Sequence, residues 1–351
     1  MIIDKATLSA KLNKLKSVVP GKSCTIPALQ GVLFSDNTLA AYNLEIAIRT
    51  TIDTDTSESF IIPASALDLI PKLPDGEIEI IEQNNQLTIN ASGIKSKHST
   101  LPVSEYPSLP VVKTQTKNTI NGAELEKTLT KIIYAVAADI GRPILTGVLF
   151  QTEEEDLNIV ATDAHRLAWA KIKYNEPADY VVPKLAIQKL LSIGLAETVE
   201  IHHTNNLALF ITGEYNIITR LLEGQYVDYK RVLPNHNNTF KANRKQLQEA
   251  VERSLLAINQ EKLSTNSIML EIEADQMKLT TKSSVSEYVE YITLSEAAKQ
   301  SAQIAFNPKY LLESIKSFDD EIIFYIGTSQ QPMLLQHENL NSLLLPVRTG
   351  R

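Results

Sequence analysis

Apolar positions recur along the chain with the spacing of a helix face. Leu8, Leu125 and Leu247 each have an apolar residue four positions later, as expected where one side of a helix is buried. The three starts lie roughly 120 residues apart, which indicates an internal repeat. The pattern predicts three copies of one structural unit.

Two further landmarks keep the same order in each copy. Residues 26–34 return as residues 142–150, sharing Gly-Val-Leu-Phe, and more faintly as residues 267–272. A proline then precedes each second helical pattern, at Pro63, Pro183 and Pro308, where its missing N–H is harmless in a first helical turn. Chance coincidence is the alternative, but three ordered landmarks favour a triplicated domain.

The polar stretches 112–117 and 234–239 each stand just ahead of a new copy, where domain boundaries are expected. We therefore predict domains over residues 1–116, 117–238 and 239–351. Alternating stretches predict strands at Thr38–Tyr42, Glu77–Ile81, Leu157–Ala161 and Gln276–Thr280. Tight turns are predicted at Asp36-Asn37, Asn84-Asn85, Asn205-Asn206 and Ala274-Asp275. The fold class is α+β, with two helices and about eight short antiparallel strands in each domain.

The cysteine content and the hydropathy of the chain indicate where in the cell the protein is expected. Cys24 is the single cysteine, so no intrachain disulfide can form. A charged-then-apolar leader and long apolar runs are both missing, so we expect a cytoplasmic protein.

Charge is unevenly distributed. The chain carries a net charge of −7, which alone argues against nucleic-acid binding. The six predicted helices, at 6–18, 63–74, 122–137, 183–193, 243–256 and 308–318, hold thirteen basic and six acidic residues, leaving −14 on the remainder. Lysine and arginine are good helix formers that simply solvate exposed faces, which is the plain alternative. If the helices share one side of a curved array, they attract phosphate there while the acidic remainder repels it.

At this point the sequence resembles the bacterial DNA polymerase III beta subunit family, the sliding clamps, from end to end. The most specific segments are residues 142–150, 160–168, 222–234 and 343–348. The resemblance implies a ring of two chains, with six domains and twelve helices around a hole that holds duplex DNA. It also implies partners, namely a polymerase and a clamp-loader ATPase that bind through a short peptide, and no catalytic activity.

The resemblance carries functional positions onto this sequence. The partner-peptide pocket would comprise Leu145, Thr162, Ala164, His165, Arg166, Leu167, Val227, Arg231, Val232, Leu343, Leu345, Pro346, Val347 and Arg348. With the charge argument, DNA would be contacted by Lys11, Lys14, Lys22, Lys127, Lys131, Arg142, Lys184, Lys189, Arg244, Lys245, Lys309 and Lys316. The dimer interface would use Tyr106, Leu109, Leu255 and Leu256. Ala164, Val227 and the tail 349–351 depart from the family pattern, which leaves the peptide preference open.

Enzymatic alternatives have weaker support. The sequence has no glycine-rich phosphate loop and no paired cysteine ligands, so we expect neither a metal nor a cofactor. His202 and His203 are adjacent, and adjacent strand residues point to opposite faces. Asp163 with His165 could imitate part of a catalytic dyad, which keeps a repeat-built hydrolase or nuclease as the rival class. A non-replicative clamp paralogue with altered partners is the other alternative.

Overall fold

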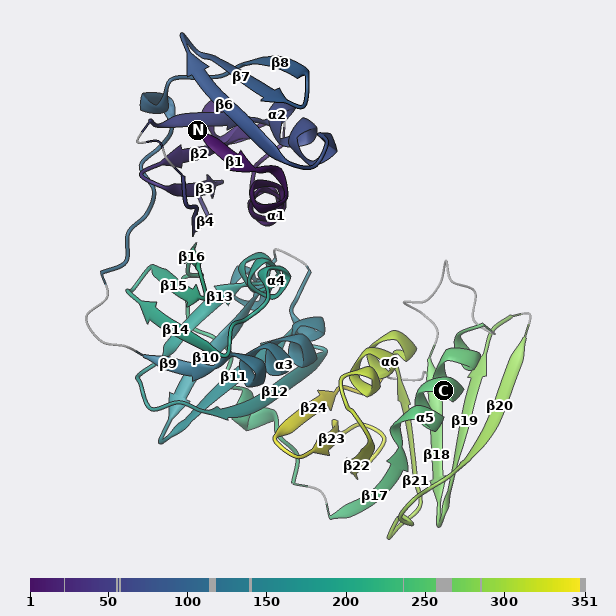
Figure 1. Ribbon diagram of the computed structural model, residues 1–351. Coiled ribbons are helices and arrows are strands. Elements are labelled where there is room, and N and C mark those ends of the chain that lie inside the picture. The colour runs from purple at the N-terminus through teal and green to yellow at the C-terminus, as the bar shows by residue number, and fades with distance from the viewer. Residues whose placement is uncertain are drawn as a thin grey trace. The chain divides into compact units, whose positions relative to one another are not determined.

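The computed structural model describes residues 1–21, 23–54, 56, 58–113, 118–138, 141–235, 237–256, 267–284 and 286–347. The chain divides into two compact units (Figure 1). Unit 1 contains Met1–Glu126 and Leu185–Leu221, and unit 2 contains Lys127–Lys184 and Leu222–Arg351. The second predicted domain contributes to both units.

Unit 1 is built on one eight-stranded and one four-stranded antiparallel sheet. The larger has the order β5-β2-β3-β4-β16-β15-β14-β9 and the smaller the order β1-β6-β7-β8. The strands are β1 (Ile2–Asp4), β2 (Gly31–Ser35), β3 (Thr38–Tyr42), β4 (Ile46–Thr51), β5 (Phe60–Pro63), β6 (Glu77–Gln83), β7 (Gln86–Ala91), β8 (Ile94–Ser99), β9 (Thr119–Asn121), β14 (Thr198–His203), β15 (Leu207–Thr212) and β16 (Tyr215–Arg220). Its helices are α1 (Lys5–Lys16), α2 (Ala64–Leu69) and, after its first residue, α4 (Lys184–Ile193).

Unit 2 repeats this plan. Its sheets have the orders β13-β10-β11-β12-β24-β23-β22-β17 and β20-β19-β18-β21. The strands are β10 (Gly147–Glu153), β11 (Asp156–Thr162), β12 (Arg166–Lys173), β13 (Asp179–Pro183), β17 (Asn238–Asn243), β18 (Ile268–Glu273), β19 (Gln276–Lys282), β20 (Glu287–Thr293), β21 (Ala302–Phe306), β22 (Glu321–Ile326), β23 (Met333–His337) and β24 (Leu340–Leu344). The helices α5 (Arg244–Leu255) and α6 (Pro308–Lys316) belong to it, and α3 (Gly122–Ile132) crosses the division between the units.

The amphipathic pattern explains why these segments are helices. In α1, Leu8, Leu12 and Leu15 are buried, while the Asp4 carboxylate accepts a hydrogen bond from the backbone N–H of Thr7 at 2.9 Å and caps the first turn. Pro71 lies within a 3₁₀ turn at Ile70–Lys72. The predicted helix 63–74 therefore ends early, because proline lacks the N–H that an α-helix needs.

Positive φ angles confirm two predicted turns. Asp36 and Asn37 have φ of 48° and 55°, and Asn84 and Asn85 have 54° and 60°, as two-residue hairpin turns require. Ala274, at the predicted turn before Asp275, has φ of 51°. Among the described residues, no helix is long and apolar enough to cross a membrane.

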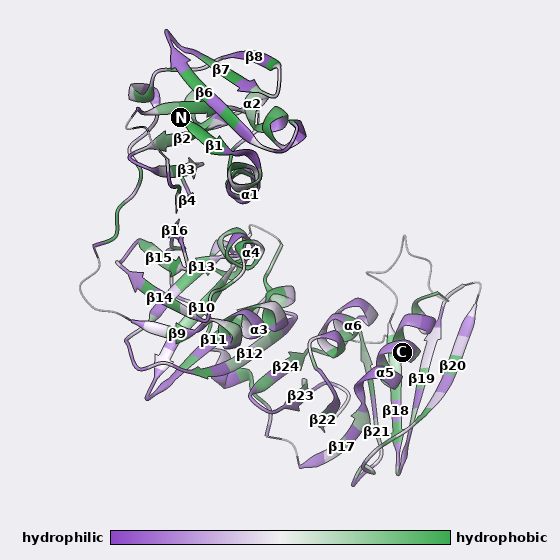
Figure 2. Cartoon of the chain, viewed as in Figure 1, coloured by the Kyte–Doolittle hydropathy of each residue, from purple (hydrophilic) through white to green (hydrophobic). Residues whose placement is uncertain are grey.

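Each large sheet joins strands of two successive domains. We call the β4–β16 pair the first junction and the β12–β24 pair the second junction. Ala47 lies opposite Ile218 in the first, and Leu167 lies opposite Leu343 in the second. The two small sheets end in the outermost strands β8 and β20, and Figure 2 shows hydrophilic and hydrophobic positions mixed along β20.

Candidate peptide pocket and cationic helices

An apolar cavity of about 180 Å³ lies at the second junction. Its lining comes from the 3₁₀ turn Pro143–Thr146 just before β10, from the β11–β12 turn, from the crossing segment 227–232 and from the end of β24. The lining residues are Leu145, Thr162, Ala164, His165, Arg166, Leu167, Val227, Asp228, Tyr229, Val232, Leu343 and Leu345. Mostly apolar walls with a few polar groups suit a short peptide with apolar anchors.

The β11–β12 turn shapes one end of the pocket. The Asp163 carboxylate accepts hydrogen bonds from the backbone N–H groups of His165 at 2.9 Å and Arg166 at 3.0 Å. The Thr162 hydroxyl donates to the carbonyl of Arg166 at 2.6 Å. Ala164 is held at φ 71°, a conformation that costs an alanine free energy. The turn therefore places Thr162, Ala164, His165 and Arg166 at the cavity wall.

Arg166 holds this turn against the third domain. Its Nε donates to Asp163 at 3.0 Å, its Nη1 pairs with Glu313, and its Nη2 donates to the carbonyl of Tyr134 at 2.8 Å. The guanidinium lies 4.4 Å from the centre of the Tyr310 ring and 5.1 Å from that of Tyr134. With all three nitrogens occupied, Arg166 supports the pocket wall rather than offering a free charge to a ligand.

A hydroxyl network continues behind this arginine. The Tyr134 hydroxyl contacts the hydroxyls of Ser314 on α6 at 3.1 Å and Ser342 on β24 at 2.8 Å. Burial raises the pKa of Tyr134, so it stays protonated and able to donate. Burial also raises the pKa of the pocket residue Tyr229, to about 12.

Most predicted pocket residues line the cavity. Arg231 does not, because its guanidinium turns to Asp228 at 2.7 Å, and Pro346 and Val347 are absent from the lining as well. Arg348 lies outside the described residues. The sequence interpretation missed Asp228 and Tyr229, although both lie inside the 222–234 segment that carried the family resemblance.

The predicted DNA-contacting cations fall into two classes. The first class binds the protein itself: Lys11 pairs with Glu214, and Lys14 donates to the carbonyls of Ser192 and Ile193 at 2.7 and 3.1 Å.

Similar ties occur in unit 2. Lys131 and Lys127 reach Asp319 at 2.6 and 3.2 Å, and Lys316 reaches Glu252 at 2.8 Å. The hydrogen bond from Lys131 is the main reason that the pKa of Asp319 lies below its usual value. Arg244 donates to Gln248.

Within the described part of the chain, the cationic groups of the second class make neither an ion pair nor a hydrogen bond. This class consists of Arg142, Lys184, Lys189, Lys245 and Lys309. Lys22 lies outside the described residues. These cations are the ones available to an external phosphate.

The residues predicted at the dimer interface are placed differently from one another. Tyr106 is buried in an apolar cluster at the first junction, and Leu109 packs against the same cluster. Leu255 ends α5, and the next residue, Leu256, is exposed. The chain itself thus covers Tyr106 and partly covers Leu109, and the dimer interface predicted from these residues stays a prediction.

The rival chemistry is not supported by geometry. Both oxygens of Asp163 are engaged by the turn and by Arg166, while the His165 ring stacks on Tyr310 with centroids 6.1 Å apart. His202 is buried, with Glu200 at 3.5 Å. In the described ranges, no group of three or more His, Cys, Asp or Glu could hold a metal ion.

Family models match almost the whole chain. They are those of the DNA polymerase III beta subunit: the N-terminal domain over residues 1–110, the central domain over 119–228 and the C-terminal domain over 230–348. The exact domain boundaries that we predict stay predictions, and the first of them falls among the undescribed residues 114–117.

Relatives and solved structures agree with these matches. A beta sliding clamp of Staphylococcus aureus is 29% identical over 367 aligned positions that cover 95% of both chains. The DNA polymerase sliding clamp of Bacillus subtilis superposes with a TM-score of 0.93 at 26% identity, and the beta subunit from Streptococcus pyogenes with 0.92 at 26%, each covering 99% of both chains. The three-domain clamp fold predicted from the sequence is confirmed.

Proposed function

Because the chain belongs to the family of DNA polymerase III beta subunits, it is a DNA sliding clamp and not an enzyme, and we propose that two copies of it close a ring around duplex DNA. The observation that carries this proposal is the state of the sheet edges. Inside the chain, β4 pairs with β16 and β12 pairs with β24. In the third domain β20 corresponds to β4 and β12, and in the first domain β8 corresponds to β16 and β24. Both β20 and β8 are outermost strands of their sheets.

Hairpin registers identify the corresponding residues. Ala47 lies opposite Tyr42 in the first domain, and Leu167 lies opposite Thr162 in the second. The same position can be found in the third domain by following the strand registers from β21, the strand before the second helix, across β18 and β19 to β20. The residue of β20 that corresponds to Ala47 and Leu167 is Glu287. On the other side, Lys97 of β8 corresponds to Ile218 and Leu343. If the third junction repeats the first two, Glu287 lies opposite Lys97 of a second copy.

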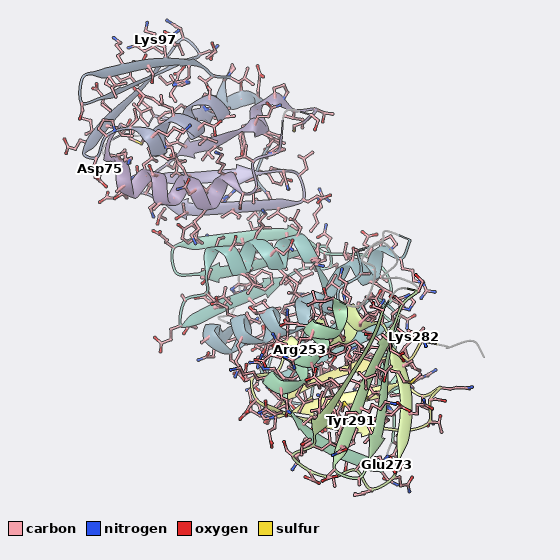
Figure 3. All side chains as sticks on the ribbon, turned by 90° about the vertical axis from the view of Figure 1, so that its right-hand side faces the viewer. Asp75, Lys97, Arg253, Glu273, Lys282 and Tyr291 are labelled. Carbon is pink, nitrogen blue, oxygen red and sulfur yellow. The ribbon has the colours of Figure 1, made fainter. Side chains whose placement is uncertain are left out.

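The two strands are suited to each other. Lys97 stands on β8 and Glu287 on β20, so one pair of opposite charges would meet in this register, while Glu290 is bound by Arg253 of its own chain. Large apolar side chains are exposed on the same strands, at Ile94, Val289 and Tyr291, and Figure 3 labels Lys97 and Tyr291 on these sheets. Free strand edges invite pairing, and a head-to-tail dimer would cover all four.

DNA would be held through charge alone. The unpaired cations Lys184, Lys189, Lys245, Lys309 and Arg142 would meet phosphates without reading bases. Duplex DNA presents about one charge per 1.7 Å, so movement along it exchanges equivalent contacts at little cost. Sliding then needs no chemistry, and a polymerase tied to the ring stays near the primer end.

The cavity at the second junction would bind the partners. Its apolar walls favour an extended peptide with aliphatic and aromatic anchors, such as a tail of the polymerase or of a clamp-loader ATPase. These partners act on DNA inside the cell, so the proposal implies a cytoplasmic protein.

The decisive experiment uses a nicked circular plasmid. The protein is loaded with a bacterial clamp loader and ATP, and retention is measured by gel filtration before and after a restriction enzyme linearises the DNA. Loss of the protein on cutting supports encirclement. Equal retention after cutting would mean ordinary binding and would refute the ring. The Glu287→Lys variant, expected to dimerise poorly, is the matched control for retention that depends on closure.

A further inference from the structure

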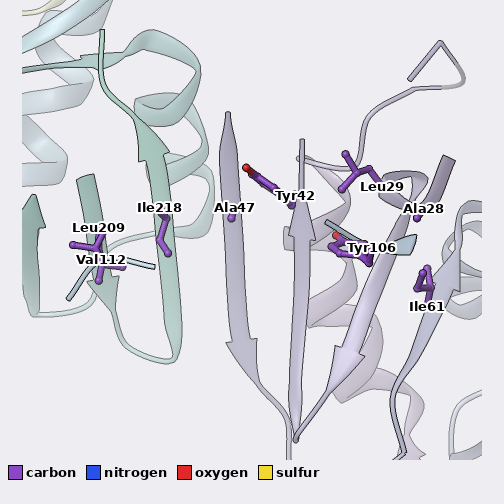
Figure 4. Packing of buried hydrophobic residues seen from close by; sticks show 9 residues of the cluster. All are labelled: Ala28, Leu29, Tyr42, Ala47, Ile61, Tyr106, Val112, Leu209 and Ile218. Atoms are coloured by element: carbon purple, nitrogen blue, oxygen red, sulfur yellow. The ribbon is translucent and has the colours of Figure 1, made fainter. Parts of the chain in front are cut away.

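The first junction contains counterparts of several apolar walls of the pocket, although Leu345 of the lining corresponds to the exposed Arg220. Leu29 corresponds to Leu145 through the shared Gly-Val-Leu-Phe segments. Ala47 pairs with Ile218 in the first junction as Leu167 pairs with Leu343 in the second, so Ala47 corresponds to Leu167 and Ile218 to Leu343. The counterparts in the first junction belong to one buried cluster, drawn in Figure 4. The two junctions thus share one framework, with a charged residue in place of one apolar wall in the first.

The turn that borders the pocket is also duplicated. The Asn43 side chain accepts hydrogen bonds from the N–H groups of Glu45 at 3.0 Å and Ile46 at 2.7 Å, as Asp163 does in the second junction. Leu44 has φ of 76°, close to the 71° of Ala164. The backbone that shapes one pocket end is therefore the same in both copies.

A crossing segment covers both junctions in the same way. The Tyr106 hydroxyl donates to the carbonyl of Ala40 at 3.4 Å, and the Tyr226 hydroxyl donates to the corresponding carbonyl of Val160 at 3.5 Å. Six residues after each tyrosine stands a valine. The relative exposure of this valine is 6% for Val112 in the first junction and 48% for Val232 at the rim of the pocket.

Two side chains fill the first copy. Tyr42 is buried opposite Ala47, whereas the smaller Thr162 lies opposite Leu167 and leaves its copy open. Val112 packs onto Leu209 and Ile218 in the same cluster (Figure 4). The segment 107–112 contains Pro107 and Pro110, while its counterpart makes a 3₁₀ turn at Tyr229–Val232 that keeps Val232 at the rim.

We infer that the first junction is a latent second site for the same class of ligand, a short extended apolar peptide, and that Tyr42 and Val112 close it. This inference rests on the proposed role of the pocket in peptide binding. Tyr42 and Val112 then keep the first junction closed, while Thr162 and Leu167 leave the pocket at the second junction open, so each chain has one peptide site.

The test counts binding sites. A dye-labelled peptide with two leucines and a phenylalanine is titrated against the full chain by fluorescence anisotropy and calorimetry. One site per wild-type chain is expected, and its loss is expected in Thr162→Tyr/Leu167→Ala, which installs the first junction's residue pair in the pocket. Tyr42→Thr/Val112→Ala is expected to bind two peptides per chain. Combining all four changes should leave one site, now at the first junction.

Cys24 supplies an independent readout of location. It packs against the first-junction cluster and is the single cysteine of the chain. A chloroacetyl form of the peptide should therefore alkylate Cys24 faster in the opened variant than in wild type, and Cys24→Ser should abolish the reaction. The milder Val112→Ala change is used if the double variant unfolds.

The outcomes separate the two proposals. No binding by wild type would refute the peptide pocket itself. One site in wild type, with folded opened variants that neither gain a second site nor alkylate faster at Cys24, would overturn the latent site and leave the pocket intact.

Discussion

Reversing one charge on β20 should weaken the dimer. Glu287 would face Lys97 of a second copy, and Glu287→Lys replaces an attraction by a repulsion. An exposed ion pair contributes about 0.2–1 kcal/mol, and like charges opposite each other in paired strands cost a similar amount. Each junction therefore loses about 1 kcal/mol, and the two junctions of a ring lose about 2 kcal/mol, which is roughly a 30-fold rise in dissociation constant.

Solvent and a neighbouring lysine limit the expected loss of dimer affinity. The Glu287 side chain retains 55% of its exposure and lies 3.8 Å from the ammonium group of Lys282, so solvent and a neighbour already screen it. Salt should reduce the effect further, because the Debye length falls from about 10 Å at 0.1 M to about 3 Å at 1 M. The difference between wild type and variant should therefore shrink as ionic strength rises.

The assay is sedimentation equilibrium at low and high salt, with two controls. Glu273→Lys makes the same charge change at the end of β18, away from the outermost strand, and should leave the dimer unchanged. Glu287→Lys combined with Lys97→Glu restores the opposite signs and should recover most of the lost affinity. Equal weakening by Glu273→Lys, or no recovery in the double variant, would refute the Glu287–Lys97 register.

Three further outcomes are expected. Ala164→Val should lower the free energy of unfolding by about 1–2 kcal/mol in chemical denaturation, because a β-branched residue at φ 71° is strained, while Ala164→Gly should stay within about 1 kcal/mol of wild type. Lys189→Ala should reduce the salt dependence of DNA binding by about one counterion, whereas Lys131→Ala should leave that slope unchanged and instead lower the melting temperature, since its ammonium group binds Asp319. Asp319→Asn should lower the melting temperature above about pH 4 but not well below it. The folded pKa of Asp319 is depressed, so the contribution of its carboxylate to stability is lost as pH falls through that pKa. The melting temperatures of wild type and variant, measured against pH, should therefore converge in acid.

The repeat made the architecture predictable from sequence. The leucine spacing located helices whose starts agree within one residue with α1, α3 and α5. Eight strands per domain follow in the described part of the chain, as β1–β8, β9–β16 and β17–β24. Helix ends were less predictable. The pattern 122–137 continues past Ile132, where the backbone tightens into a 3₁₀ turn at Ile133–Ala135.

Side-chain pairing could not be predicted in the same way. Lys11 and Glu214 lie 203 positions apart in sequence, and only the fold brings them together. A cationic helix pattern therefore gave one list of DNA contacts, although the described structure divides it into cations that hold the protein together and cations that stay free. The difference between Tyr42 opposite Ala47 and Thr162 opposite Leu167 likewise became visible only once strand register was known.

If two copies close a ring as proposed, the junction between chains needs different chemistry from the two junctions inside each chain. The first two form within one chain and are permanently buried, so apolar pairs such as Ala47 with Ile218 stabilise them without exposing a hydrophobic edge. The strands of a third junction must stay in water whenever the chain is alone or the ring is open. Lys97 on β8 and Glu287 on β20 would discourage pairing of like edges and favour the pairing in which these two opposite charges meet. A weaker, ion-paired junction between chains is also the one that a loader could open to admit DNA while the junctions inside each chain stay closed.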